Sequence, residues 1–327
     1  MKRFAYARPA SVGDALRLFA ERPEASRYKA GGVDLIDRLK EHLDEPDRVI
    51  ALDGIPARDA IEVGPQGLRL GSGVSLAAVA DHGAARERYA ALVEAARESA
   101  APQIRNQATV VGNLLQRPRC WYFRNEQLVC IKKGGATCYA IAGDHRYHAI
   151  FGGGPSFIVH PSNCAAALVA FDAALEIESL DGRRSVALEQ FFTLPTVDVK
   201  RENSLAPGEL VTAITAPAPA PGTRSAYLEV RERAQFDWPL AAVAAVLQLD
   251  GGTVRSARIV LGAAAPIPWR ATEAEQALAG QTVSQTSARA AGAAAIRGAT
   301  PLPGTRYKLP LFETLVARAV LTAAGAA

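Results

Sequence analysis

The sequence predicts a two-domain protein of mixed α/β class, with an α+β domain at its C-terminal end. Its 327 residues suffice for two domains at about 150 residues each. Helical and strand patterns alternate through the N-terminal third, and a Pro-rich segment at 216–222 is followed first by strand patterns and then by helical ones. We therefore expect one domain over residues 1–216 and a second over residues 222–327.

Short local signals predict the elements of the N-terminal third. The segment from Ser11 to Asp14 is typical of a capping box, which predicts a helix whose apolar face extends to Phe19. The pair Gly31-Gly32 separates a short strand from the helix that follows it. Strands are expected at 27–30, 49–52 and 67–71, and helices at 34–40, about 76–82 and about 87–100.

The middle of the chain loses this periodicity between residues 101 and 154, where Gly, Pro, Arg and Cys accumulate. A strand at 157–160 and an apolar helix at 165–171 follow, the helix capped by Pro161-Ser162-Asn163. Asp181-Gly182 predicts a hairpin turn. Beyond the Pro-rich linker, strands are expected at about 224–232, 241–249 and 253–262, and helices at about 271–279, 285–297 and 309–324.

The composition excludes several classes of protein. With 49% hydrophobic and 21% charged residues, the chain has an ordinary globular composition. Its net charge of +4 is too small to indicate the concentrated basic face of a nucleic-acid-binding protein. There is neither an apolar run of about eighteen residues nor the apolar segment of a secretory signal. We expect no nucleic-acid partner, no membrane span and a cytoplasmic location.

Two glycine-containing segments are candidate sites for a phosphorylated ligand. Ala30-Gly31-Gly32 lies between a predicted strand and a helix, whose N-terminus presents unpaired N–H groups to an anion. In the segment 107–113, Thr109 and Asn113 supply hydrogen-bonding groups, and Gly112 allows backbone amides to face an anion. Taken alone, each segment is more often a simple glycine turn than a ligand site. The patterns of a Rossmann or P-loop nucleotide site are absent from the sequence.

The four cysteines all lie between residues 120 and 164. Because reducing compartments disfavour disulfides, thiols confined to one segment suggest a metal or iron–sulfur site. The close cysteine pairs of most zinc sites are missing, whereas iron–sulfur clusters tolerate irregular spacing. Neighbouring Arg and Lys side chains would stabilise thiolates. For the last cysteine, a small apolar residue inside a helix is an equally good interpretation. The candidate ligands are Cys120, Cys130, Cys138 and Cys164.

The sequence contains no self-contained acid–base or nucleophilic motif. The five histidines show no ligand spacing, and we expect His145 and His148 to be solvated. If the chain is part of an enzyme, a bound cofactor must supply the chemistry.

Three ordered motifs, 30–35, 108–113 and 160–163, resemble the FAD-binding subunit of the molybdenum hydroxylases, the family of xanthine dehydrogenase and carbon monoxide dehydrogenase. The segment 204–210 and the C-terminal region extend the resemblance over nearly the whole chain. It implies a two-lobed FAD-binding domain of the vanillyl-alcohol-oxidase type, with lobes at about 1–55 and 56–216. It also implies a C-terminal domain like that of the carbon monoxide dehydrogenase flavoprotein.

The resemblance also implies which residues bind FAD. Leu205 matches a leucine that packs against the isoalloxazine ring. Asn163 would lie at a helix N-cap near the flavin, where the family usually has Asp; Asn keeps the hydrogen-bond geometry without the charge. The residues implied to hold the pyrophosphate and ribityl chain are Lys29, Ala30, Gly31, Gly32, Val33, Asp34, Leu35, Thr109, Gly112 and Asn113.

The segment 117–156 resembles an insertion that binds a [4Fe–4S] cluster in some flavin subunits of this family. These are the subunits of 4-hydroxybenzoyl-CoA reductase and of the bacterial periplasmic aldehyde oxidoreductase. Cys120, Cys130 and Cys138 would then be ligands. Where such relatives are expected to have a further cysteine, this chain has Ser156. Either Cys164 completes the set, or the cluster has a non-cysteine ligand, is labile or is missing.

The implied function is electron transfer. A large subunit with a molybdenum cofactor would oxidise the substrate, a small subunit with [2Fe–2S] centres would carry the electrons, and the FAD of this chain would pass them to an external acceptor. A partner's signal could carry the complex to the periplasm. Two alternatives remain open. One is a stand-alone flavin reductase, such as the enolpyruvyl reductase of peptidoglycan-precursor synthesis, and the other is a non-catalytic assembly subunit whose thiols hold zinc.

Overall fold

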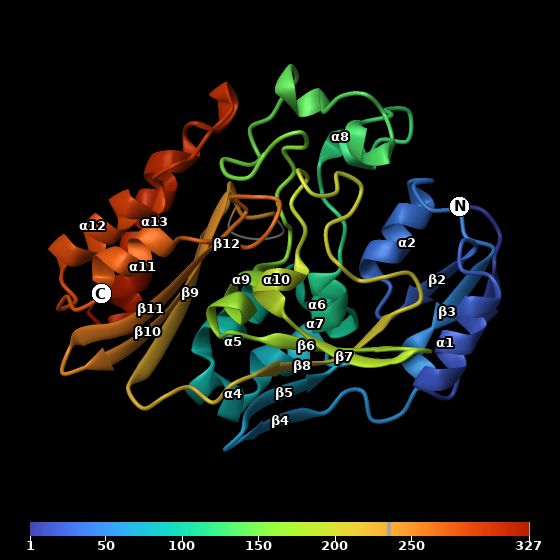
Figure 1. Cartoon of the computed structure of the whole chain (residues 1–327), viewed down its shortest axis with the longest axis horizontal. Coiled ribbons are helices and arrows are strands. Elements are labelled where there is room, and N and C mark those ends of the chain that lie inside the picture. The colour runs from blue at the N-terminus through green and yellow to red at the C-terminus, as the bar shows by residue number, and fades with distance from the viewer. Residues whose placement is uncertain (234–236, 327) are drawn as a thin grey trace.

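A small parallel sheet forms the first unit of the chain (Figure 1). The computed structural model describes residues 1–233 and 237–326. The strands β1 (Ala5–Ala7), β3 (Arg48–Ala51) and β2 (Ser26–Lys29) pair in that order, all parallel. The helices α1 (Val12–Glu21) and α2 (Val33–Lys40) connect them, and α1 begins at the predicted cap, where the Ser11 hydroxyl accepts a hydrogen bond from the Asp14 N–H.

The second unit is an antiparallel sheet covered by helices. Its strand order is β4 (Ile61–Gly64), β5 (Gly67–Gly71), β8 (Leu210–Ala216), β6 (Ala174–Ser179) and β7 (Gly182–Ala187). The helices are α3 (Leu76–Asp81), α4 (Gly83–Arg88), α5 (Ala90–Glu98), α6 (Pro102–Gln107), α7 (Val110–Leu114), α9 (Asn163–Ala170) and α10 (Leu188–Phe191).

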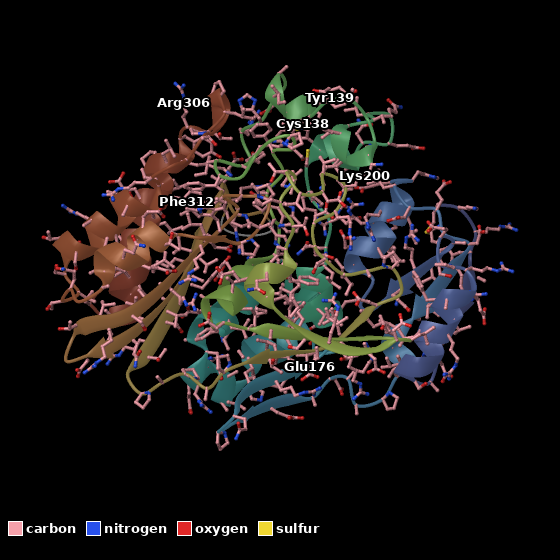
Figure 2. The ribbon with its side chains drawn as sticks, in the orientation of Figure 1. Cys138, Tyr139, Glu176, Lys200, Arg306 and Phe312 are labelled. Atoms are coloured by element: carbon pink, nitrogen blue, oxygen red, sulfur yellow. The ribbon has the colours of Figure 1, made fainter. Side chains whose placement is uncertain are left out.

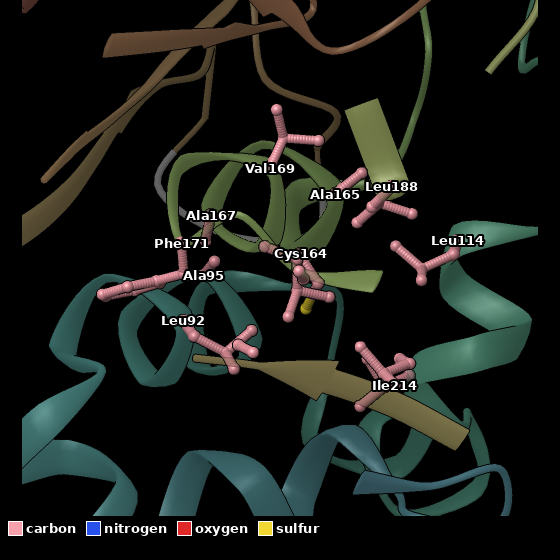
Figure 3. Close-up of a cluster of buried hydrophobic side chains, with 14 of the residues drawn as sticks. Leu92, Ala95, Leu114, Cys164, Ala165, Ala167, Val169, Phe171, Leu188 and Ile214 are labelled. Carbon is pink, nitrogen blue, oxygen red and sulfur yellow. The ribbon is translucent and has the colours of Figure 1, made fainter. Parts of the chain in front are cut away.

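The core of this second unit lies around α9. Every residue of α9 is buried, because the helix is apolar on all sides and packs between α5 and the sheets. Figure 3 shows its small side chains among Leu92, Leu114 and Ile214. The position of the first residue of α9, which matters for the site below, is therefore fixed by a fully packed helix.

The cysteine-bearing insertion, 117–156, lies beyond the carboxyl end of α7 and consists mainly of loops (Figure 1). Its regular elements are α8 (Trp121–Arg124) and short 3₁₀ turns at Ile131–Lys133 and Tyr139–Ile141. Buried ion pairs attach it to the rest of the chain: the Glu202 carboxylate lies 3.0 Å from Arg117 Nε and 2.8 Å from Lys132 Nζ.

The C-terminal unit is an antiparallel sheet with helices on one face (Figure 1). Its strand order is β12 (Trp269–Arg270), β11 (Thr253–Gly262), β10 (Ala241–Asp250) and β9 (Thr223–Val230). The helices α11 (Thr272–Leu278), α12 (Gln285–Ala295) and α13 (Lys308–Ala324) form a second core with it. No helix in the described ranges has the length and apolar character needed to cross a membrane.

Most of the predicted elements are present, and the differences arise from long-range packing. The helix expected at 87–100 is broken at Tyr89, because this buried side chain packs on Phe171 and its hydroxyl donates to the Pro217 carbonyl at 2.8 Å. Residues 157–160, which we expected to form a strand, do not pair into a sheet. Their backbone makes isolated hydrogen bonds instead, such as the one from the His160 N–H to the Ala265 carbonyl. The strands β4 and β8 and the helix α7 were not predicted.

We expect Glu202→Gln to lower the free energy of unfolding by about 3 kcal/mol, because it leaves buried Lys132 without its counter-charge. Burial alone would raise the pKa of Glu202, but Arg117 and Lys132 outweigh it and hold the pKa below 4.5. The ion pair therefore stabilises the fold above about pH 4.5 and is lost as the pH falls through the folded-state pKa. Denaturant unfolding at several pH values measures both effects.

Glu178→Gln is the matched control, since Glu178 pairs with the largely exposed Arg183. It should cost less than about 1 kcal/mol. A Glu202 variant as stable as the control would contradict the anchoring role of the buried pair.

Candidate functional site

A cavity of about 760 Å³ lies where the first and second units meet. Residues from α2, α6, α7 and α9 line it, and Asp237, Trp238 and Pro239 of the C-terminal unit contribute to its wall. All residues predicted to bind FAD lie around this one cavity, although they come from distant parts of the sequence: Lys29, Ala30, Gly31, Gly32, Val33, Asp34, Leu35, Thr109, Gly112, Asn113, Asn163 and Leu205.

The Gly31-Gly32 turn forms one side of the cavity. Gly32 precedes α2 with a positive φ of 81°. Within residues 1–233 and 237–326 no side chain caps the helix, so its first N–H groups are open to a ligand. A Cβ on Gly31 would collide with the carbonyl oxygen of Gln107. The Gln107 side chain also donates to the Gly31 carbonyl at 3.2 Å. Only glycine therefore permits this contact between the two units.

The segment from Thr109 to Asn113 forms the opposite side, and it is helical rather than a loop. Thr109 caps α7 by accepting the Gly112 N–H at 3.0 Å, so this amide is used inside the protein and does not face an anion. Asn113 accepts the Ser162 hydroxyl at 2.5 Å, and Ser162 in turn caps α9. The predicted N-cap at Asn163 is thus one residue too late, because the Ser162 hydroxyl accepts the Ala165 N–H.

The Asp34 carboxylate lies at the centre of a cluster of arginines, which it pairs with instead of facing a phosphate directly. Its carboxylate lies 2.6 Å from Arg124, 3.1 Å from Arg119 and 3.3 Å from Arg38. Burial alone would raise the pKa of Asp34, but these arginines hold it below its ordinary value. Arg38 and Arg119 also line the cavity. Asp34 therefore positions two cations where a diphosphate would need them.

Two further predicted residues complete the wall. Asn163 begins α9, and its Nδ2 donates to the Glu229 carboxylate at 2.8 Å. Leu205 is half-buried against the core of the second unit. Trp238, which the sequence did not reveal, is half-exposed at the wall, and the Arg119 guanidinium lies over its ring at 4.9 Å. The C-terminal unit thus closes on the cavity through an aromatic ring.

The structure places Cys164 in the hydrophobic core of the second unit and not in the insertion with the other three cysteines, which does not support its prediction as a metal ligand. The side chain is fully buried in α9 among apolar residues, as Figure 3 shows. Burial raises its pKa to about 12, with a hydrogen bond to Ser99 opposing this only in part. The thiol is therefore protonated. The alternative interpretation, a small apolar residue in a helix, is the one that the structure supports.

The other three cysteines lie in the insertion and form no disulfide; Figure 2 labels Cys138 there. Burial raises the pKa of Cys120 to about 11, and the nearby thiols of Cys138 and Cys130 add to this rise. In the described residues, no three side chains of Cys, His, Asp or Glu converge as ligands of a single metal ion. The structure therefore brings three thiols into one neighbourhood without forming a compact site for one ion.

His148, which we expected to be solvated, is instead buried beside the thiols. Its Nε2 lies 3.3 Å from Cys120 Sγ, and its Nδ1 has no hydrogen-bond partner in the described part of the chain. Burial, reinforced by Lys308, lowers its pKa to about 4, so the ring is neutral. Lys308 is itself fully buried, and its partners among the described residues are the carbonyls of Ala263 (2.9 Å) and Tyr147 (3.4 Å).

Comparison with known proteins agrees with this architecture. Residues 2–219 match the family described as "FAD binding domain in molybdopterin dehydrogenase", and residues 225–323 match the "CO dehydrogenase flavoprotein C-terminal domain". The chain belongs to the FAD-binding medium subunits of the molybdenum hydroxylases. The mixed α/β fold and the assignment as an oxidoreductase subunit are thereby confirmed.

Two relatives and one solved structure illustrate the match. The chain is 38% identical over 292 residues to the aldehyde oxidoreductase FAD-binding subunit PaoB of Escherichia coli, covering 88% of this chain and 90% of that protein. It is 27% identical to the carbon monoxide dehydrogenase medium chain of Hydrogenophaga pseudoflava, covering 97% and 96%. A solved structure of that bacterium's carbon monoxide dehydrogenase superposes with a TM-score of 0.77 at 27% identity, covering 99% of this chain and 98% of the other.

We expect Gly31→Ala to weaken FAD binding about tenfold or more, because the new Cβ collides with the Gln107 backbone and displaces the turn. Titration of the flavin-free chain with FAD, followed by flavin fluorescence, measures the affinity. Gly83→Ala is the control: Gly83 lies in α4 and has open space around its Cα, so this variant should bind FAD like the wild type. Unchanged affinity in the Gly31 variant would contradict the assignment of the turn.

Proposed function

We propose that this chain is the flavin subunit through which electrons leave a molybdenum hydroxylase complex. FAD would bind in the cavity of about 760 Å³, between the Gly31-Gly32 turn and α7. When bound, FAD supplies two-electron acceptance and release. The partners would be a molybdenum-cofactor-binding large subunit and a [2Fe–2S] small subunit, with an external electron acceptor. The observation that carries the proposal is the convergence of every predicted FAD residue on this single cavity.

The residues around the cavity have separate tasks. The free N–H groups at the start of α2 and the guanidinium groups of Arg38 and Arg119 would bind the diphosphate. Leu205 would provide an apolar contact for the ring. Trp238 would restrict the access of water from the C-terminal side.

We also propose a division into two domains, 1–216 and 222–327, the first with lobes 1–55 and 56–216. In support of this boundary, β8 ends at Ala216 and β9 begins at Thr223.

Purification of the tagged chain from its own host under anaerobic conditions tests the proposal. We expect about one FAD per chain, two co-purifying protein chains and molybdenum. A flavin-containing chain that purifies alone and turns over a reductase substrate would favour the stand-alone reductase. A flavin-free chain that contains zinc would contradict the electron-transfer function altogether.

We also propose a location in the reducing cytoplasm, because none of the four cysteines forms a disulfide. A partner's signal could instead carry the complex to the periplasm.

We further propose that the insertion 117–156 holds a [4Fe–4S] cluster through Cys120, Cys130 and Cys138, with His148 as the fourth ligand. The contact of 3.3 Å between His148 Nε2 and Cys120 Sγ supports this choice. Ligands of a cluster bind different irons and are spread around it, so they need not converge as they would on one ion. Lys308, buried without a carboxylate partner, would balance the negative charge of the cluster.

His148→Ala is expected to lose most of the iron and acid-labile sulfide, while flavin binding continues. His145→Ala is the matched control, because both nitrogens of His145 are already used, with the Gly143 carbonyl and the Gly304 N–H, each at 2.8 Å. Cys164→Ala should also retain the iron. Iron and sulfide assays with Mössbauer spectra check these outcomes. Full iron content in the His148 variant, or zinc in place of iron in the wild type, would contradict the proposed ligand set.

A further inference from the structure

A side chain of the C-terminal unit holds one of the residues that line the FAD cavity. Asn163 lines the cavity and is 7% exposed, and its Nδ2 donates to Glu229 Oε2 at 2.8 Å. Glu229 lies on β9, which belongs to the antiparallel sheet of the C-terminal unit. The contact therefore joins the start of α9 to a strand far along the sequence.

The other neighbours of Glu229 are also donors. The Tyr227 hydroxyl donates to Glu229 Oε2 at 2.8 Å, and the Arg231 guanidinium forms an ion pair with Oε1. Burial raises the pKa of Glu229, while the hydrogen bond from Tyr227 and the charge of Arg231 oppose the rise. Asn163 and Tyr227 both donate to Oε2, while Oε1 faces the Arg231 cation, and these surroundings favour an ionised carboxylate.

An ionised carboxylate determines how the Asn163 amide is oriented. Because such a carboxylate can only accept, the nitrogen of the amide must face Glu229, and the reverse orientation would set oxygen against oxygen. Asn163 then has its oxygen, Oδ1, and the second N–H of its amide left for a ligand. Oδ1 is the acceptor among them, and it can take a hydrogen bond from an N–H or O–H donor of a ligand in the cavity.

We propose that Glu229 is a positioning residue for the flavin nucleotide. It fixes the Asn163 amide so that Oδ1 accepts a hydrogen bond from a ribityl hydroxyl or a ring N–H of FAD. The inference rests on the proposed binding of FAD in this cavity. This role makes the FAD site depend on the contact between Glu229 of β9 and Asn163 at the start of α9. Glu229 itself need not touch the cofactor.

The test exchanges the charge between the two positions. In Asn163→Asp, two carboxylates face each other, so we expect FAD affinity to fall about tenfold or more, with recovery as the pH is lowered and one carboxyl takes up a proton. In the double variant Asn163→Asp with Glu229→Gln, the new amide donates to the new carboxylate and to Tyr227. Its affinity should return to within about threefold of the wild type and should not depend on pH in this way.

Asn163→Asp with Glu98→Gln is the matched control. Glu98 also lines the cavity and also pairs with Arg231, at 3.2 Å, but Asn163 donates to Glu229 and not to it. This variant also removes one carboxylate that pairs with Arg231, but not the one that faces position 163, so it should not restore affinity. FAD titration measures the affinities, and circular dichroism with thermal melting of the flavin-free chains shows that each variant is folded.

Two outcomes would overturn the inference: wild-type affinity in Asn163→Asp, or equal rescue by the Glu98 and Glu229 substitutions. The second result would mean that only the net charge of the wall matters. A wild-type chain that binds no FAD would instead contradict the proposed function, so the two failures are distinguishable.

Discussion

The close contact between Gly31 and the backbone of Gln107 is the constraint on which the cavity depends. It sets the distance between α2, which follows the parallel sheet, and α6, which belongs to the antiparallel sheet. A side chain at Gly31 would force these units apart. The positive φ of Gly32 then turns the chain so that α2 begins at the cavity with its N–H groups free. The shape of the site thus follows from two adjacent residues without side chains.

Charge is organised around this contact by buried carboxylates. Asp34 gathers Arg38, Arg119 and Arg124, and so attaches the insertion to the same helix that lines the cavity. Glu202 attaches the insertion a second time through Lys132. Removing one member of a buried ion pair leaves an uncompensated charge. These contacts therefore couple the position of the insertion to the position of α2 and the cavity. The C-terminal unit contacts the insertion where the Arg119 guanidinium stacks on the Trp238 ring.

The sequence predicted those parts of the site that lie in short contiguous motifs. Gly32 and Thr109 owe their roles to local backbone geometry, which residue type indicates directly, whereas the contact of Gly31 with Gln107 is long-range and appears only in the structure. The core position of Cys164 could not be predicted, because its environment is set by packing that no local pattern reveals. The burial of His148 and the contact of Glu229 with Asn163 were missed for the same reason: each depends on segments far apart in the chain. The helical form of the segment after Thr109 shows that a cap residue can outweigh β-branched neighbours.

The central claim is that FAD binds between the Gly31-Gly32 turn and α7. Amide hydrogen exchange of the chain with and without FAD tests it most directly, because it reports on the backbone at both sides of the cavity. The account predicts slower exchange in 30–36 and 109–114 when FAD is bound, with little change in α11 and α12, which lie away from the cavity. Binding of FAD without protection of either segment, or with protection confined to other elements, would contradict it.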